Sequence, residues 1–124
     1  MYAITRDLTA QIYKVAFDGH SLANECDRGV VNVHRVWWVQ AETVIGFLNG
    51  YEEKKKEPEK KEYLEAAEKE WAFIRDHVID KRPGSEWFWE VDPEGNPYPD
   101  RPIVEPWKCP YHNGRMCMEV MKRC

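Results

Sequence analysis

Hydrophobic side chains recur every three or four residues in two long segments of the first half of this chain, a spacing that predicts amphipathic helices. The first segment, residues 3–17, has an apolar stripe and stops at Asp18–Gly19, a pair that favours a helix end. The second, residues 35–51, is apolar on most sides, so we expect it to be buried on most sides. The stripe of the first segment comprises Ile4, Leu8, Ile12, Val15 and Ala16.

Two further helices are predicted in the second half. Residues 52–61 mix Glu and Lys, which indicates a solvated connection. Within it, Pro58 suits the first turn of a third helix, which should run to Asp80. The last predicted helix is short, from about Asn113 to the end, because methionine and valine recur there at helical spacing. Asn113 is its predicted N-terminal cap.

Irregular segments rich in turn-forming residues separate these helices. Residues 19–34 include a valine-rich stretch, Val30–Val33, that predicts a short extended piece. Residues 86–98 predict a β-hairpin with its turn at Asp92–Asn96 and a short second arm, because two prolines there cannot donate backbone hydrogen bonds. We therefore expect one mainly α-helical domain over residues 1–124, with about four helices and a short β-hairpin.

Charge and composition exclude several classes of function. The net charge is −4, which gives no electrostatic basis for binding nucleic acid. No apolar run approaches the ~20 residues that a membrane span requires, and the N-terminal segment lacks the apolar region of a signal peptide. The four cysteines show neither a disulfide framework nor a common zinc spacing. We expect a cytoplasmic protein without metal, cofactor, nucleic-acid or membrane partners.

The stretch Pro106–Arg115 concentrates the candidate chemistry. Its prolines favour an extended lead-in, so His112 should lie at the junction with the last helix and Arg115 about one turn inside it. These two side chains can then point at one small volume. An imidazole, a guanidinium and an indole suit a polyhydroxylated ligand that must lose a proton. The histidines at 20, 34 and 77 are interpreted as loop or surface residues without chemistry.

Glu42 is the second unusual residue, because it sits in the predicted helix that is apolar on most sides. An unpaired carboxylate would be costly there, so it needs a partner, a water molecule or a ligand. Two alternatives stand equal at this level: a salt bridge, for which Arg115 is a candidate, and a direct contact to substrate.

Two blocks of sequence resemble the late motifs of the N-acylglucosamine 2-epimerase and cellobiose 2-epimerase superfamily. One is Trp107–Cys117, read as Trp-Lys-Cys-Pro-Tyr-His-Asn-Gly-Arg-Met-Cys, and the other is Arg35–Glu42, read as Arg-Val-Trp-Trp-Val-Gln-Ala-Glu. They occur in the order of the family, and the resemblance extends over nearly the whole chain. It implies a partial (α/α)6 toroid, of which this chain would be the C-terminal third.

The resemblance also implies roles for individual residues. Enzymes of this family invert C2 of a reducing sugar of the cellobiose, N-acylglucosamine or mannose type through an enediolate. His112 matches one of their two catalytic histidines. Arg115 and Glu42 match substrate-binding residues. Trp107 matches an aromatic residue that packs against the sugar, and Trp37 or Trp38 would supply another stacking face. Trp38 is preferred, because it lies one helical turn before Glu42.

The sequence departs from the family in one respect that bears on activity. The second catalytic histidine of the family belongs to a Gly-His-Asp-Ile-Glu type of motif, and this chain has no such motif. We therefore expect little or no epimerase activity from this chain alone. The partners expected are a complementary N-terminal half or further copies of the chain. The alternative is a carbohydrate-binding or self-associating remnant without turnover.

Overall fold

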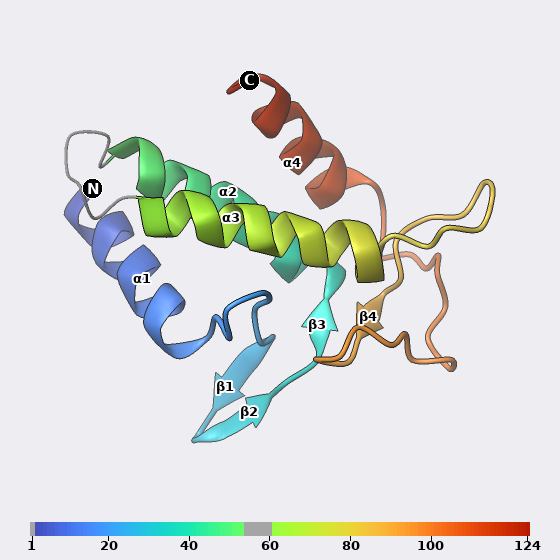
Figure 1. Cartoon of the computed structure of the whole chain (residues 1–124). Helices are drawn as coiled ribbons and strands as arrows, with labels where there is room; N and C mark the ends of the chain where they lie inside the picture. Colours follow the sequence, from blue (N-terminus) through green and yellow to red (C-terminus); the bar gives the residue numbers. More distant parts are fainter. Residues whose placement is uncertain (1, 54–60) are drawn as a thin grey trace.

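The computed structural model describes residues 2–53 and 61–124. Four α-helices dominate, as the hydrophobic periodicity predicts, and strands of two or three residues lie in the connections (Figure 1). In chain order the elements are α1 (Tyr2–Val15), β1 (Glu25–Asp27), β2 (Val30–Asn32), β3 (Arg35–Val36), α2 (Trp37–Glu53), α3 (Lys61–Phe73) with a π-helical continuation (Ile74–Val78), β4 (Glu90–Val91) and α4 (Tyr111–Met121).

Helix α2 is the centre of the structure, since α1, α3 and α4 all pack on it. Its sequence is apolar on most sides, and Trp37, Ala41 and Phe47 are completely or almost completely buried. Ile74 and Met116 lie in the same core. The prediction of a mostly buried second helix is confirmed, and this burial places the polar residues of α2 in an apolar setting.

An aromatic cluster joins the first three helices. Phe47 of α2 makes edge-to-face contacts with Tyr13 and Phe17 from the region of α1, at centroid distances of 5.9 and 5.2 Å. It also stacks on Tyr63 of α3, whose ring meets Tyr13 edge-on. Aromatic pairs of this kind contribute about 0.5–1.5 kcal/mol each beyond the burial of their area.

The segment before α2 is tied to it through a buried amide. Gln40 Oε1 accepts a hydrogen bond from the backbone N–H of Leu22 at 3.0 Å, and Gln40 Nε2 donates to the carbonyl of Leu22 at 2.9 Å. Because both polar groups of the amide are satisfied, it can be buried without a large penalty. The loop that leads into the strands β1 and β2 is therefore fixed against α2.

The predicted hairpin of residues 86–98 is confirmed only at its turn. The N–H of Asp92 donates to the carbonyl of Asn96 at 2.9 Å, and Gly95 has the positive φ of 90° that the turn requires. The return arm meets the first only at Val91 and Pro97. β4 pairs instead with β3, where Arg35 faces Val91 and Val36 faces Glu90. The prolines of the return arm leave β4 without a continuous neighbour on that side.

The start of the last helix differs from the sequence-based prediction. Helix α4 begins at Tyr111, two residues before Asn113, with Pro110 at the N-cap position (φ −73°). Asn113 is not the cap, because its side-chain amide donates to Glu86 Oε1 at 2.7 Å. The predicted role of Pro58 falls within residues 54–60, outside the described residues.

No described helix combines the length and apolar character that a membrane crossing requires.

Candidate active site

The candidate site lies where the first turn of α4 meets the side of α2. His112 Nδ1 is 2.7 Å from Glu42 Oε1, and Arg115 Nη2 donates to the same oxygen. His112 and Arg115 are three positions apart on α4, so both reach the same side of the helix. The structure thus brings together three of the predicted site residues. It also shows that Arg115 is a salt-bridge partner of Glu42.

The pKa of the Glu42 carboxyl is lowered. Partial burial, the largest influence, acts to raise it, but hydrogen bonds from His112 and Arg115 and the charge of Arg115 outweigh the burial. Glu42 is therefore an ionised carboxylate at neutral pH, and an ionised carboxylate only accepts hydrogen bonds. Nδ1 of His112 must then carry the hydrogen, and in the neutral imidazole Nε2 is left with a lone pair that can take up a proton.

Two tryptophans flank the imidazole in different ways. The ring centroids of Trp37 and Trp38 each lie 5.6 Å from that of His112, the first edge-on and the second tilted. Trp37 is 1% exposed and belongs to the core, whereas Trp38 is 43% exposed. Trp37 therefore supports the imidazole from the side of the core. Of the two tryptophans, Trp38 is the one whose ring has a face open to a ligand.

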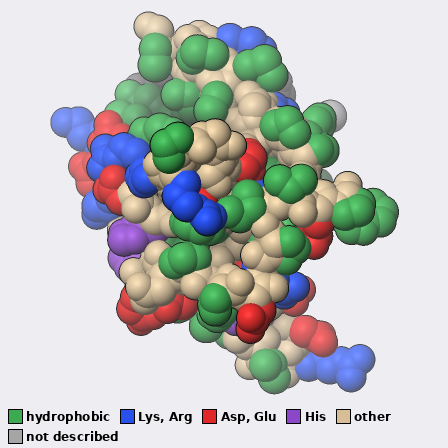
Figure 2. Space-filling view, turned by 90° about the vertical axis from the view of Figure 1, so that its right-hand side faces the viewer, with side chains coloured by type: hydrophobic (Ala, Val, Ile, Leu, Met, Phe, Trp, Pro, Cys, Tyr) green, Lys and Arg blue, Asp and Glu red, His purple; other side chains and the backbone are tan. Residues whose placement is uncertain are grey.

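Trp107 is not part of this cluster. It is 84% exposed, and among the described residues no ring contact joins it to His112. It lies on the loop before α4. Figure 2 shows one face of the molecule, on which hydrophobic and charged side chains are both exposed. The structure leaves its role in binding sugar as a prediction.

Tyr111 is a neighbour that the sequence did not single out. Its ring meets His112 edge-on at a centroid distance of 5.1 Å, and Arg115 lies over its face at 5.0 Å. Arg115 Nη1 also donates to the Tyr111 hydroxyl at 3.2 Å. The separation of four positions between Tyr111 and Arg115 would have indicated this contact if the helix start had been placed correctly.

A second set of polar contacts holds the start of α4. Glu86 Oε1 accepts from the amide of Asn113, and Glu86 Oε2 accepts from Lys108 Nζ at 2.6 Å. The side chain of Lys108 is 1% exposed and its ammonium lies 5.5 Å from the centre of the Trp37 ring. No local sequence signal connects Glu86 to residues more than twenty positions later, so sequence reasoning missed this set.

A hollow of about 220 Å³ adjoins the cluster between α1 and α2. Trp38 and Glu42 form part of its wall, and Asn24 and Thr43 add polar groups. Most of the remaining lining is apolar, contributed by residues such as Ile12 and Phe47. A ligand with an apolar face and hydroxyl groups could lie here against the open side of Trp38.

The remaining histidines lie outside the cluster. His34 Nδ1 is 3.0 Å from Glu90 Oε2, and its ring stacks on Tyr98. His77 packs against Phe73. Among residues 2–53 and 61–124, no group of three or more His, Cys, Asp or Glu side chains is arranged to hold a metal ion.

The helices and the site together define a class of protein: an assembly of packed helices that carries a histidine, a glutamate and an arginine where α4 meets α2. The sequence profile described as N-acylglucosamine 2-epimerase (GlcNAc 2-epimerase) matches residues 5–114. This chain belongs to the N-acylglucosamine 2-epimerase family, and it forms a C-terminal segment of the fold.

Individual relatives agree with this assignment. The chain is 52% identical over 122 residues to a cellobiose 2-epimerase of Eubacterium cellulosolvens, covering 98% of this chain and 29% of that protein. It is 46% identical over 123 residues to a cellobiose 2-epimerase of Dictyoglomus turgidum, covering 99% of this chain and 30% of that protein. The chain therefore spans under a third of these relatives.

Solved structures show the same arrangement. A sugar epimerase from a ruminal bacterium superposes with a TM-score of 0.88 at 43% identity, over 95% of this chain and 29% of that one. A D-mannose isomerase superposes with a TM-score of 0.74 at 28% identity, over 90% of this chain and 28% of that one. The prediction of a partial (α/α)6 toroid is confirmed.

Proposed function

We propose that this chain supplies one half of the active site of a sugar 2-epimerase, with His112 as one of its two acid–base groups. The observation that carries the proposal is the contact between His112 Nδ1 and the Glu42 carboxylate, because it leaves Nε2 free to exchange a proton. The substrate would be a reducing sugar of the cellobiose, N-acylglucosamine or mannose type, in its open-chain form.

In this mechanism one base removes the proton from C2, and the electron pair of the C–H bond moves to form the C1–C2 double bond of an enediolate. The negative charge then lies on the former carbonyl oxygen. An acid returns a proton to the other face of C2, and the carbonyl is restored. His112 Nε2 performs one of these transfers, and the transfers contribute to rate most when the pKa of the group is close to the working pH.

Arg115 would stabilise the enediolate oxygen. Among the described residues its hydrogen bonds go to Glu42 and Tyr111, which use two of its five N–H groups, and its side chain is 40% exposed. A fixed cation close to the developing charge lowers the barrier to proton removal. Trp38 would hold the apolar face of the sugar, and Glu42 would keep both His112 and Arg115 in place.

The second acid–base group must come from another polypeptide segment, since the matching motif is absent from this sequence. A complementary N-terminal half of the fold would supply it, and self-association of the chain is the other assembly that we consider. A cytoplasmic location is part of the same proposal.

A carbohydrate-binding module without turnover is the second candidate. The observation in its favour is the 43% exposure of Trp38 beside the hollow at Glu42, which offers a stacking face that does not depend on a second histidine. Measurable sugar affinity without any exchange of the C2 hydrogen in a complete protein would favour this candidate over the epimerase.

Isotope exchange tests the proposal. The purified chain would be incubated in heavy water with cellobiose, N-acetylglucosamine or mannose, and deuterium at C2 followed by NMR. We expect no exchange from the chain alone. We expect exchange from a fusion in which this chain replaces the aligned 122 residues of the Eubacterium cellulosolvens enzyme.

The variant His112→Asn of the fusion is the negative control and should lose the exchange. A folded fusion that exchanges no deuterium with any of the three sugars would contradict the epimerase proposal. Exchange at enzymatic rates by the chain alone would contradict its incompleteness.

A further inference from the structure

One carboxylate, from the loop that follows α3, is bonded to residues on both sides of His112. Glu86 Oε1 accepts from the side-chain amide of Asn113 at 2.7 Å, and Glu86 Oε2 accepts from Lys108 Nζ at 2.6 Å. Lys108 is four positions before His112, and Asn113 directly follows it. A single residue from another segment therefore holds the chain in front of and behind the imidazole.

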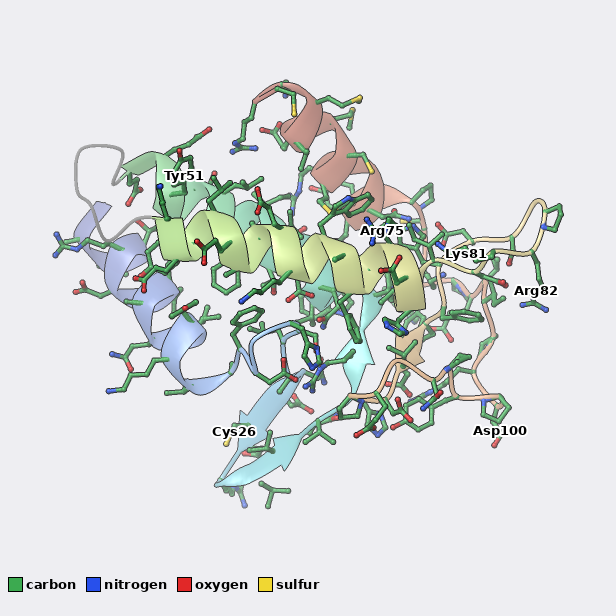
Figure 3. The ribbon with its side chains drawn as sticks, in the orientation of Figure 1. Cys26, Tyr51, Arg75, Lys81, Arg82 and Asp100 are labelled. Carbon is green, nitrogen blue, oxygen red and sulfur yellow. The ribbon has the colours of Figure 1, made fainter. Side chains whose placement is uncertain are left out.

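The carboxylate that makes these two bonds is itself held in place. Its Oε2 also accepts from the backbone N–H of Trp87 at 2.8 Å. The loop that leads to Glu86 extends away from the helices, with Lys81 and Arg82 on its outward part (Figure 3). It closes where the N–H of Asp80 donates to the carbonyl of Glu86 at 3.3 Å. Glu86 is thus anchored to the end of the α3 segment as well as to α4.

The ammonium of Lys108 uses all three of its hydrogens in this set. Besides Glu86 Oε2, it donates to the carbonyls of Trp87 and Ile103, the latter at 2.8 Å. The Lys108 side chain is 1% exposed, and Glu86 is its ion-pair partner. A buried ammonium is stable only when it is paired with an opposite charge and its hydrogens are bonded. The segment that leads into α4 is therefore fixed at Lys108.

Helix α4 depends on this support because it begins without a side-chain cap. Pro110 occupies the N-cap position and has no side-chain acceptor for the free N–H groups of the first turn. Helix ends of this kind open at a low free-energy cost. His112 lies in that first turn. The bonds from Glu86 to Lys108 and Asn113 supply from outside the helix what a cap would supply within it.

The same set reaches the inner side of the imidazole through Trp37. The Lys108 ammonium lies 5.5 Å from the centre of the Trp37 ring, and that ring meets His112 edge-on at a centroid distance of 5.6 Å. Because Trp37 is closely packed in the core, it has little room to move independently of these neighbours. A displaced Lys108 would shift the support of the imidazole together with the start of α4.

We propose that Glu86 is a positioning residue, which acts through the neighbours of His112. It holds the imidazole where Nδ1 donates to Glu42 and Nε2 is left to exchange a proton. A shift of about 1 Å in a catalytic group can lower a rate on the order of 100-fold, so a residue that never touches the sugar can govern turnover. The effect on turnover rests on the proposed function, whereas the effect on the imidazole does not.

The tautomer of His112 tests the inference without any sugar. Long-range proton–nitrogen NMR spectra of the isotopically labelled chain distinguish hydrogen on Nδ1 from hydrogen on Nε2, and His112→Asn assigns the signals. Asn113→Ala removes one bond to Glu86 and leaves the buried pair of Lys108 intact, so the variant should fold. We expect hydrogen on Nδ1 in the unsubstituted chain and a second population with hydrogen on Nε2 in Asn113→Ala.

Asn96→Ala is the matched control. The Asn96 amide donates to Asp92 Oδ2 at 2.9 Å, which is also a bond from an asparagine amide to a carboxylate, and it belongs to the turn at residues 92–96. Its loss should leave the tautomer of His112 unchanged. If Asn113→Ala also keeps the tautomer of the unsubstituted chain, the inference is overturned, whatever the rate of exchange.

Kinetics in the fusion with the Eubacterium cellulosolvens enzyme provide a second readout. Asn113→Ala should lower kcat for C2 exchange by about tenfold and leave KM for the sugar within about twofold, because the stacking face of Trp38 belongs to α2 and stays in place. Glu86→Gln should lower kcat further, since its amide presents one acceptor oxygen where the carboxylate presents two. A purely structural role would lower the midpoint of thermal unfolding and leave kcat of the folded fusion unchanged.

The outcomes separate this inference from the proposed function. A shifted tautomer in Asn113→Ala, together with an unsubstituted fusion that exchanges no deuterium, would support the positioning role and contradict the epimerase proposal. An unshifted tautomer and an unchanged kcat in Asn113→Ala would overturn the positioning role and leave the epimerase proposal intact. A shifted tautomer with an unchanged kcat would contradict His112 as an acid–base group.

Discussion

His112 Nδ1 lies 2.7 Å from Glu42 Oε1, although the two residues are 70 positions apart in the sequence. The contact joins the start of α4 to the side of α2, and the same carboxylate oxygen accepts from Arg115. One carboxylate oxygen thus holds the imidazole of His112 and the guanidinium of Arg115 together. It also determines which imidazole nitrogen is free, because an ionised carboxylate cannot donate a hydrogen.

Replacement of Glu42 by glutamine should lower activity more than stability. In the fusion with the Eubacterium cellulosolvens enzyme, Glu42→Gln should reduce the rate of C2 exchange by roughly 100-fold, because the amide does not favour one imidazole tautomer and does not compensate the charge of Arg115. Glu65→Gln, on the exposed side of α3, is the control of matched chemistry and should have no effect. If the rate of C2 exchange for Glu42→Gln lies within about twofold of the rate for the unsubstituted fusion, Glu42 has no role in the mechanism.

The lowered pKa of Glu42 predicts how the stability of the fold depends on pH. The carboxyl has a folded-state pKa below its usual value of 4.5, so it binds fewer protons when folded than when unfolded. Its stabilising contribution is therefore complete above pH 4.5 and is lost as the pH falls through the lower, folded-state value. With about a third of the side chain exposed, we expect a contribution of about 1 kcal/mol.

Urea unfolding between pH 3 and pH 6 measures this contribution as the difference between the parent chain and Glu42→Gln. The difference should be largest near pH 6 and shrink toward pH 3. A difference that stays constant over this range would show that the ionisation of Glu42 does not stabilise the fold.

Glu70 of α3 should behave in the opposite way. Its side chain is fully buried, and neither carboxyl oxygen has a hydrogen-bond partner among the described residues. Burial first, and then the negative charge of Asp18, raise its pKa well above 4.5, although Arg35 opposes this. The folded state therefore holds the proton more tightly than the unfolded state, and stability falls as the pH rises above 4.5.

Glu70→Gln removes this ionisation and keeps the shape of the side chain. The variant should gain stability relative to the parent as the pH rises from 4.5 to 8, by about 1–3 kcal/mol at the upper end. Guanidinium unfolding at pH 5 and pH 8 measures the gain. Equal stability differences at the two pH values would contradict a buried, protonated Glu70.

The sequence predicts the helices of this chain well from their periodic apolar positions, although the stripe of α1 is largely exposed at Ile4, Leu8 and Val15. It predicts the start of α4 less well, since the side chain of Asn113 binds Glu86 instead of capping the helix. The pairing of β3 with β4 was missed, because it joins Arg35 to Val91 and no local signal connects two residues so far apart. The salt bridge between Arg115 and Glu42 also depends on packing of helices that the sequence alone does not place.

The two adjacent tryptophans of α2 should have separable roles. Trp38→Ala should weaken sugar binding and C2 exchange in the fusion by about tenfold or more, with little loss of stability, because its ring is 43% exposed. Trp37→Ala should destabilise the isolated chain by about 3–5 kcal/mol, because it opens a cavity in the core. Thermal unfolding and sugar titration of both variants separate these effects. A loss of sugar binding for Trp37→Ala in a fully folded protein would reverse the assignment.

Two glycines of α2 offer a test of how closely α1 and α3 pack on this helix. A Cβ added at Gly46 would meet no atom within 4 Å, whereas one added at Gly50 would lie 3.0 Å from Thr9 Cγ2 and 3.4 Å from the Tyr63 ring. Glycine within a helix costs about 0.5–1 kcal/mol relative to alanine, so Gly46→Ala should stabilise the chain by about that amount. Gly50→Ala gains the same helix propensity but must displace Thr9, so its net gain should be smaller or negative. Urea unfolding of both variants measures the difference, and an equal gain for both would show that α1 and α3 do not approach α2 closely at Gly50.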